Sequence, residues 1–189
     1  MSDRLSKSRP FPPGPFDVVY ADPPWRYKHG TCDPKDAIEN KYPTMPLRAI
    51  CRLPVIEIAS DHSALFMWTT APKLGEAMEV IGWWGFELVS GVVWDKLRMG
   101  LGYYARIQHE HLLIATRGKP GVPPVNARVR SVVRVPHPGI HSRKPKVFRT
   151  MIENMYPNAR RIELFARQRF PGWEAWGNDP AILAGASEV

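Results

Sequence analysis

The sequence predicts a single α/β domain built on an open, mostly parallel β-sheet. Its 189 residues fall within the usual size of one folded core. Short apolar runs alternate with segments of helical spacing, which is typical of strands connected by helices. One run, Ala64–Thr70, is almost continuously apolar, as expected of a strand covered on both faces. In such sheets ligands bind outside the carboxyl ends of the strands, so we expect the functional residues there.

The first predicted strand is Phe16–Ala21. Its apolar run ends at Asp22, because the two prolines that follow cannot continue β-pairing. The polar segment 26–46 then predicts a loop. Residues Leu47–Ile58 have a weak helical spacing that breaks at Pro54. The first strand therefore leads directly into an acidic residue and a rigid turn.

A second helix is predicted after Pro72, a position at which a first helical turn tolerates proline. Leu74, Met78 and Ile81 recur there at helical spacing, and nearby glycines end the pattern. The same criteria predict further strands at Leu88–Trp94, His111–Thr116, Val129–Val135, Arg161–Phe165 and Trp173–Trp176, and a helix at Lys144–Met155.

The composition excludes several classes of protein. Hydrophobic residues make up 44% of the chain, which argues against global disorder. No apolar run approaches the roughly 18 residues that a membrane helix needs, and the first residues do not resemble a secretory signal. Two cysteines cannot form a disulfide framework or a four-cysteine zinc site, so we expect a cytoplasmic protein with reduced thiols and no metal. The expected domain covers residues 16–180, with tails at 1–15 and 181–189.

Positive charge is concentrated in one part of the chain. The net charge is +8, but residues 96–149 contain twelve basic residues and one acidic residue, which leaves −3 for the rest. A one-signed stretch of this length suggests a polyanionic partner and is well suited to phosphate contacts. We expect the loops Leu97–Arg106 and Gly118–Arg130 to hold nucleic acid. The predicted substrate contacts are Lys96, Arg98, Tyr103, Tyr104, Arg106, Arg128 and Arg130.

Two further residues are weaker candidates for the same surface. Tyr42 is predicted to line the acceptor pocket, with a packed core aromatic as the alternative. Glu110 is the one acidic residue of the basic segment. We therefore expect it to pair internally with a lysine or arginine, and also to help shape the base pocket.

The segment Asp22-Pro23-Pro24-Trp25 carries the clearest chemical signal. The Asp22 carboxylate and a Pro23 carbonyl fixed by the proline rings offer two acceptors, and Trp25 offers a flat face. This set matches an exocyclic amino group on a heteroaromatic ring. Adenine fits, and cytosine fits nearly as well. A rigid turn with a packed tryptophan is the alternative, and the tetrapeptide alone leaves both open.

The chemistry expected of Asp22 follows from its acidity. An aspartate with a pKa near 4 is too weak to deprotonate an aromatic amine in the ground state. We therefore expect Asp22 to orient the amine and to stabilise the positive charge that develops on its nitrogen.

An ordered series of segments resembles the MT-A70 family of N6-adenine methyltransferases over about residues 16–180. The series comprises Asp22–Trp25, Lys41–Met45, Leu65–Thr70, Trp94–Lys96, Glu110-His111, His141–Pro145, Ile162–Arg167 and Gly177-Asn178. The resemblance implies a Rossmann-like class I methyltransferase fold with helices on both faces of the sheet and a permuted motif order. It also implies S-adenosylmethionine as the cofactor.

Within that family, a short basic catalytic domain is similar to the bacterial and phage DNA-modifying branch. The implied function is methyl transfer to the 6-amino group of a flipped-out adenine in DNA. RNA adenosine methylation, cytosine methylation and a catalytically silent binding partner stay open as alternatives. A small protein gains surface for duplex DNA from a second subunit, so we expect a homodimer.

The resemblance also implies individual cofactor contacts. Asp22, Pro23, Pro24 and Trp25 are implied for the reacting amine and base, with Asp22 also near the cofactor. The implied cofactor-binding residues are Ser142, Lys144, Arg167, Arg169, Asn178 and Asp179. Lys144 is expected at the carboxylate end of the cofactor. The family member that methylates messenger RNA has a His-Asn pair close to the sequence positions at which this chain has Arg169 and Phe170. Arg169 is therefore expected at the methionine end of the cofactor.

Overall fold

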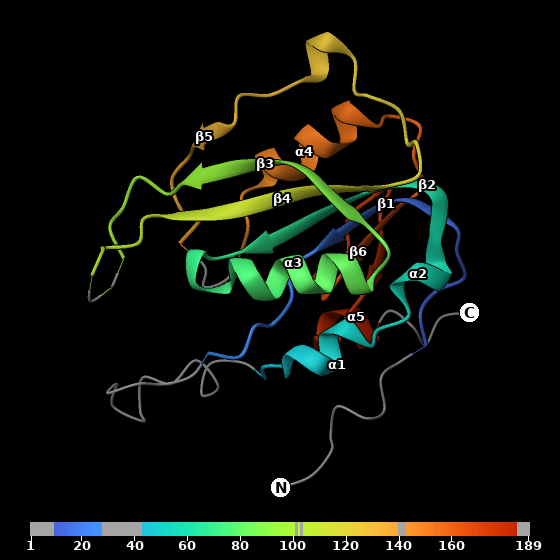
Figure 1. Cartoon of the computed structure of the whole chain (residues 1–189), viewed down its shortest axis with the longest axis horizontal. Coiled ribbons are helices and arrows are strands. Elements are labelled where there is room, and N and C mark those ends of the chain that lie inside the picture. Colours follow the sequence, from blue (N-terminus) through green and yellow to red (C-terminus); the bar gives the residue numbers. More distant parts are fainter. Residues whose placement is uncertain (1–9, 28–42, 101, 103, 140–142, 185–189) are drawn as a thin grey trace, which may run out of the picture.

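The computed structural model describes residues 10–27, 43–100, 102, 104–139 and 143–184. In these residues seven strands form one open sheet in the order β5-β3-β4-β2-β1-β6-β7 (Figure 1). The strands are β1 (Phe16–Ala21), β2 (Ala59–Thr69), β3 (Glu87–Asp95), β4 (His109–Arg117), β5 (Val132–Arg134), β6 (Arg161–Leu164) and β7 (Glu174–Trp176). The α-helices are α1 (Leu47–Cys51), α2 (Val55–Ile58), α3 (Leu74–Trp83), α4 (Lys146–Met155) and α5 (Pro180–Ala184).

The sheet is mixed because one strand is reversed. β1 pairs in parallel with β2 and β6, β6 with β7, and β3 with β5. β4 is antiparallel to both of its neighbours, β2 and β3. The reversal follows from the direct connection between β3 and β4, since neighbouring strands joined by a hairpin run in opposite directions. The predicted open α/β sheet is therefore confirmed, with β4 as the antiparallel member.

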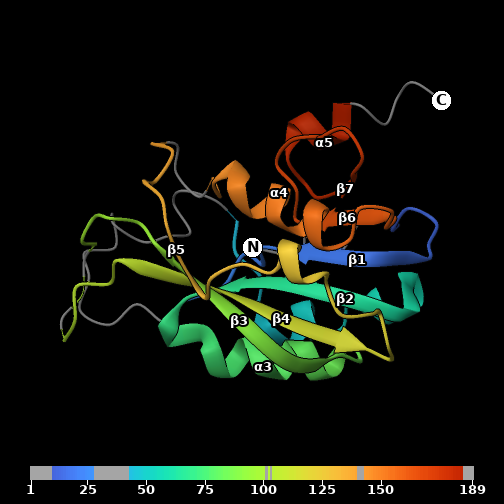
Figure 2. The same cartoon turned by 90° about the horizontal axis from the view of Figure 1, so that it is seen from above.

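Helices cover both faces of the sheet (Figure 2). Alternate residues of β2 point to opposite faces, as the pleat requires. Leu65 and Met67 join a core cluster with α1 and α3, whereas Ala64, Phe66 and Trp68 join a second cluster with α4. From Ser63 to Thr69 β2 is buried on both sides, which explains the nearly continuous apolar sequence of this part of the strand.

Helix α4 illustrates how the sequence positions an element. Phe148, Met151, Ile152 and Met155 are all buried, and their spacing places them on one helical face. The helix begins after Pro145, in agreement with the tolerance of helix starts for proline. It lies on the sheet face that carries Phe66 and Trp68.

Several element boundaries differ from the sequence predictions. The strand predicted at Val129–Val135 has only three residues, because β5 pairs with no more than the last three residues of β3 at the sheet edge. Helix α5 occupies part of the predicted tail 181–189. Two 3₁₀ turns, η3 (Ala71–Lys73) and η4 (Val125–Ala127), were also not predicted. In the described part of the chain, no helix could span a bilayer.

The packing of α4 gives a stability prediction. Ile152 is fully buried, so Ile152→Ala leaves a cavity and should lower the free energy of unfolding by about 2–5 kcal/mol. Val147 lies on the same helix but is 44% exposed, so Val147→Ala should change it by less than about 0.5 kcal/mol. Urea unfolding of both variants measures the difference. Equal losses would contradict the assigned helix face.

Candidate active site

Asp22 lies at the carboxyl end of the central strand β1. β1 ends at Ala21, between β2 and β6, so the Asp22 side chain emerges at the middle of the sheet edge. The Oδ2 atom of Asp22 accepts a hydrogen bond from Nζ of Lys144 at 2.7 Å. Lys144 precedes α4, so this ion pair connects the first strand to a helix far along the sequence. The carboxylate is 30% exposed and the lysine side chain 14% exposed.

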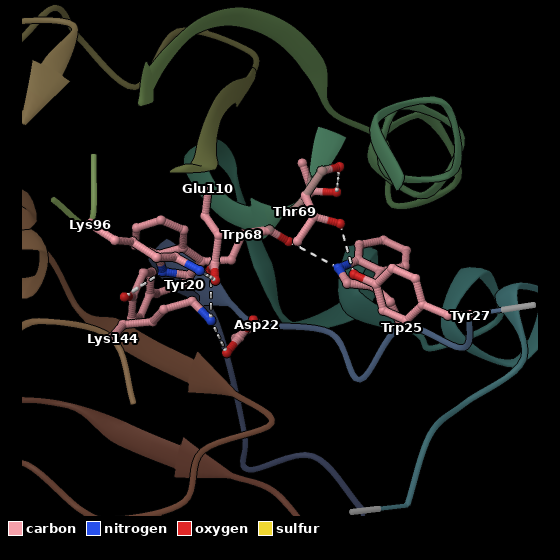
Figure 3. A network of polar contacts seen from close by, with 10 residues as sticks. Tyr20, Asp22, Trp25, Tyr27, Trp68, Thr69, Lys96, Glu110 and Lys144 are labelled. Atoms are coloured by element: carbon pink, nitrogen blue, oxygen red, sulfur yellow. Dashed lines mark hydrogen bonds and ion pairs between the residues drawn. The ribbon is translucent and has the colours of Figure 1, made fainter. Parts of the chain in front are cut away.

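Two more charged residues extend this pair into a row (Figure 3). Nζ of Lys144 also lies 3.3 Å from Oε2 of Glu110, and Oε1 of Glu110 lies 2.5 Å from Nζ of Lys96. Lys96, Glu110, Lys144 and Asp22 thus alternate in sign, and we call them the charged row. The prediction that Glu110 pairs with an internal basic residue is confirmed, with two lysines as partners.

Aromatic rings form the floor beneath the charged row. Nζ of Lys144 lies 5.3 Å from the centre of a Trp68 ring, and Nζ of Lys96 lies 5.2 Å from that of Trp94. The Trp68 indole donates its N–H to the Tyr20 hydroxyl at 2.6 Å. Cation–π attraction and this hydrogen bond restrict where the two ammonium groups can lie.

Burial and pairing act on the charged row in opposite directions. Burial alone would lower the pKa of Lys144, but Asp22 and Glu110 together raise it above its ordinary value. Burial, together with the neighbouring Glu110, raises the pKa of Asp22 above its ordinary value although Lys144 acts to lower it. For Glu110, burial is outweighed by Lys144 and Lys96, which hold its pKa below the usual range. Lys144 is therefore firmly protonated between two carboxylates.

The turn after Asp22 differs from the prediction in two respects. The Trp25 amide donates to the Pro23 carbonyl at 2.8 Å, so that carbonyl already has a partner within the turn. The Trp25 indole is only 5% exposed and donates its N–H to the Trp68 carbonyl at 3.1 Å. The face of Trp25 is therefore packed rather than open, and the predicted contact of Trp25 with a base stays a prediction. The alternative, a packed tryptophan in a rigid turn, describes the structure.

Trp25 and Tyr27 belong to a second group of contacts in Figure 3, apart from Asp22. The Tyr27 hydroxyl shares a hydrogen bond with the Thr70 hydroxyl at 2.7 Å. The Met45 amide donates to the Pro24 carbonyl at 2.8 Å. These contacts hold the turn against the end of β2 and the start of α1.

The predicted cofactor residues lie mainly after β6 and β7. Asp179 follows β7, and its Oδ1 atom accepts the Ala181 amide at 3.0 Å at the start of α5. Arg169 points towards the same helix and donates to the Ile182 carbonyl at 3.1 Å. Arg167 and Asn178 are exposed. The structure thus brings Asp22 and Lys144 together but turns Arg169 towards α5.

Some predicted residues lie outside the described part of the chain, namely Tyr42, Tyr103 and Ser142. Of the predicted substrate contacts that are described, Lys96 and Glu110 are held in the charged row. The others are exposed, and these are Arg98, Tyr104, Arg106, Arg128 and Arg130.

The twelve basic residues of segment 96–149 fall into two groups. Five lie within 4 Å of a carboxylate: Lys96, Arg117, Arg134, Lys144 and Arg149. Seven are exposed and have no acidic partner within the described residues: Arg98, Arg106, Lys119, Arg128, Arg130, Arg143 and Lys146. The second group is available to phosphates.

These exposed residues do not all lie at the same end of the sheet. The loop after β3 projects from the carboxyl end of the parallel strands (Figure 1). The segment 118–131 begins at the opposite end, where the Lys119 amide donates to Nδ1 of His62 at the start of β2. It then crosses the α4 side of the sheet, and Ser131 accepts the Val93 amide. We call it the return segment; it begins at the end of the sheet opposite to the charged row, and its predicted contact with nucleic acid stays a prediction.

A second ion pair lies below the charged row and was not predicted. Arg149 of α4 pairs with Glu163 of β6 at 2.5 Å. Glu163 is a register partner of Tyr20, two residues before Asp22. The signal that could have found this pair is the glutamate itself, an acidic residue inside an otherwise buried strand. Its arginine partner could not be chosen from the many in the chain.

The fold and the charged row define an α/β enzyme whose site lies at the carboxyl ends of central parallel strands. The MT-A70 family model matches residues 16–179. The chain is 36% identical over 179 residues to the type II methyltransferase M.MunI of a Mycoplasma species, covering 86% of this chain and 76% of that protein. The chain therefore belongs to the MT-A70 family, and the predicted methyltransferase class is confirmed.

Longer relatives match over part of their length. The human N(6)-adenosine-methyltransferase catalytic subunit METTL3 is 31% identical over 189 residues, which cover 90% of this chain and 30% of the human protein. The N6-methyladenosine RNA methyltransferase MTA1 of Pyricularia oryzae is 34% identical over 182 residues, or 87% of this chain and 46% of that protein. This chain thus spans less than half the length of both.

The charged row predicts a pH dependence of stability. Because the pKa of Glu110 is lowered in the folded state, its stabilisation is present above the unfolded pKa of about 4.3 and is lost as the pH falls through the folded value. Glu110→Gln should cost about 1–3 kcal/mol of unfolding free energy at neutral pH. The cost should shrink towards pH 3, as measured by urea unfolding.

Glu87→Gln is the matched control, since Glu87 is exposed on β3. It should behave like the wild type at each pH. A Glu110→Gln deficit that stayed constant from neutral to acidic pH would show that the lost interaction is not the ionised carboxylate.

Proposed function

We propose that this enzyme transfers a methyl group from S-adenosylmethionine to the 6-amino group of adenine in DNA. The observation that carries the proposal is the position of Asp22, at the end of the central strand and before a double-proline turn, with its carboxylate bound to Lys144 at 2.7 Å. This places an ionisable acceptor at the edge of the sheet where ligands of such folds bind.

Asp22 can receive the amine without leaving Lys144. Among the described residues, only Oδ2 of Asp22 has a hydrogen-bond partner, so Oδ1 can accept an amino hydrogen. The Pro23 carbonyl accepts the Trp25 amide and retains a second lone pair for the other hydrogen. Two acceptors on one amino group orient its nitrogen, and the carboxylate stabilises the charge that develops there as the methyl group is transferred.

The residues present fit the amino-acid end of S-adenosylmethionine. That end carries an ammonium and a carboxylate, and the site offers the complementary Asp22 and Lys144 side by side. Asn178 and Asp179, at the end of β7, can meet ribose hydroxyls, as acidic residues at strand ends do in dinucleotide sites. When bound, the cofactor supplies an activated methyl group on a sulfonium. Arg167 and Ser142 stay proposed contacts.

The similarity to the methyltransferase M.MunI favours DNA, because the match covers 76% of that protein. The seven exposed basic residues support any nucleic acid, since phosphate contacts carry no sequence information. Adenine is favoured over cytosine by the N(6)-adenosine names of METTL3 and its relatives. Extrusion of the adenine from a duplex would bring its amino group to Asp22.

RNA is the second candidate substrate, and the similarity to the RNA methyltransferase MTA1 favours it. A silent binding partner is a weaker candidate, because the segment Asp22–Trp25 is intact. Family membership also supports a Rossmann-like cofactor fold with permuted motif order. The domain limits 16–180, the homodimer and the cytoplasmic location stay predictions.

The first test of this function is Asp22→Ala. Loss of the carboxylate removes the acceptor for the amine, so kcat/KM for methylation should fall by about 10²-fold or more. Nucleoside mass spectrometry after incubation with S-adenosylmethionine and either DNA or RNA measures N6-methyladenine. Asp61→Asn is the control, because Asp61 is an exposed aspartate at the other end of β2. Full activity of Asp22→Ala would refute the mechanism. Methylation of RNA but not of DNA by the wild type would show that RNA is the substrate.

The second test concerns the return segment. Arg128 and Arg130 are exposed and without acidic partners in the described residues, so we expect each to neutralise about one phosphate. The double variant Arg128→Ala/Arg130→Ala should reduce the slope of log K against log salt by about 2. Fluorescence anisotropy with labelled DNA measures it. The control variant Arg48→Ala, on α1, should leave the slope unchanged. An unchanged slope in the double variant would exclude the return segment from the interface with DNA.

A further inference from the structure

Arg149 places a guanidinium 5.9 Å from the ring of Tyr20, two residues before Asp22 on β1. It lies in the first turns of α4, its side chain is 11% exposed, and its Nη2 atom donates to Oε2 of Glu163. The guanidinium lies 3.4 Å from the centre of the Phe170 ring. Stacking on an aromatic ring fixes the plane of the donor fork, so the directions of its N–H groups are set by the fold.

One of these N–H groups has no acceptor. Within the described residues, the buried Nε atom of Arg149 lacks any hydrogen-bond partner. Buried donors in proteins are almost always satisfied, and an unmet one beside a charge is costly. Lys144, in contrast, already has two carboxylate partners. The missing hydrogen-bond acceptor therefore lies at Nε of Arg149, although Glu163 already pairs with the guanidinium.

The position of Arg149 connects it to the charged row through shared neighbours. Its guanidinium lies 5.9 Å from the centre of the Tyr20 ring, and Tyr20 accepts the Trp68 indole N–H. Lys144 lies over that same indole. Glu163 is close enough for Asp22 and Lys144 to influence its pKa, which burial raises. Arg149 and Asp22 thus both act electrostatically on Glu163.

Arg169 is expected at the methionine end, and that role stays a prediction, since its side chain is bonded to α5 in this structure. Arg169 donates to the Ile182 carbonyl on α5. Its neighbour Phe170 instead supports the Arg149 guanidinium. The segment after β6 therefore contributes to the site by positioning a cation that comes from α4.

We propose that Arg149 is a further cofactor-binding residue, which binds the carboxylate of the cofactor's amino-acid end through its Nε–H. A carboxylate has two oxygens, so it can meet Arg149 and Lys144 together, while Asp22 meets the ammonium. Glu163 and Phe170 act as positioning residues for the guanidinium. The inference rests on the proposed function, because it takes S-adenosylmethionine as the cofactor.

The test measures binding rather than turnover, with two probes that differ in one end. S-adenosylhomocysteine retains the amino-acid end, and 5′-methylthioadenosine lacks it. Arg149→Gln alone would leave Glu163 buried and unpaired, so the variant of choice is Arg149→Gln/Glu163→Gln, compared with Glu163→Gln. By calorimetry, the Kd for S-adenosylhomocysteine should rise about tenfold or more in the double variant only. The Kd for 5′-methylthioadenosine should stay unchanged.

Arg161→Gln is the matched control, because Arg161 also carries a buried Nε atom without a partner but bonds to the carbonyls after α4. It should bind both probes like the wild type. Unchanged S-adenosylhomocysteine binding in the double variant overturns the proposal and leaves only water as the missing acceptor. An equal loss in Glu163→Gln assigns the effect to Glu163 and also overturns it. Wild-type protein that binds neither probe contradicts the proposed function itself.

Discussion

The ion pair between Asp22 and Lys144 joins two parts of the chain that are 122 residues apart, and the arrangement of the site depends on it. Taking a single charge out of water is costly, and a buried pair is tolerated only with good geometry and additional partners. Glu110 and Lys96 supply those partners, so the charges alternate and the row as a whole is neutral. The row therefore holds the Asp22 carboxylate in a fixed position at the sheet edge, where the proposed substrate amine would meet it.

The central part of the fold could be predicted because its physical signals are local. The apolar runs of β1 and β2 and the spacing of Phe148, Met151, Ile152 and Met155 follow from burial of one face or both. The reversal of β4 and the shortness of β5 depend on which strands become neighbours, and no local pattern encodes that choice. α5 is a short helix whose start is bonded by Asp179, and it lacks the length that makes periodicity visible.

The site could be predicted in part for a similar reason. Asp22 stands out because an acid before two prolines at a strand end has few structural uses, and Glu110 because it is one acid among twelve bases. The tetrapeptide left two positions for Trp25 open, and it packs because its indole N–H donates to the Trp68 carbonyl and the ring gains burial. Arg149 was missed because its partners lie on β6 and in the loop after it.

The antiparallel direction of β4 also determines the path of the return segment. Because β4 is antiparallel, it ends at the end of the sheet opposite to the charged row, and the chain then crosses back over α4. The Tyr156 hydroxyl donates a hydrogen bond to the Gly121 carbonyl of this crossing segment. If the return segment binds nucleic acid as proposed, its contour length would set the length of nucleic acid that its arginines can cover. The charged row belongs to other elements. Under that proposal, an insertion or deletion in the return segment would change the length of nucleic acid covered without altering the residues of the charged row.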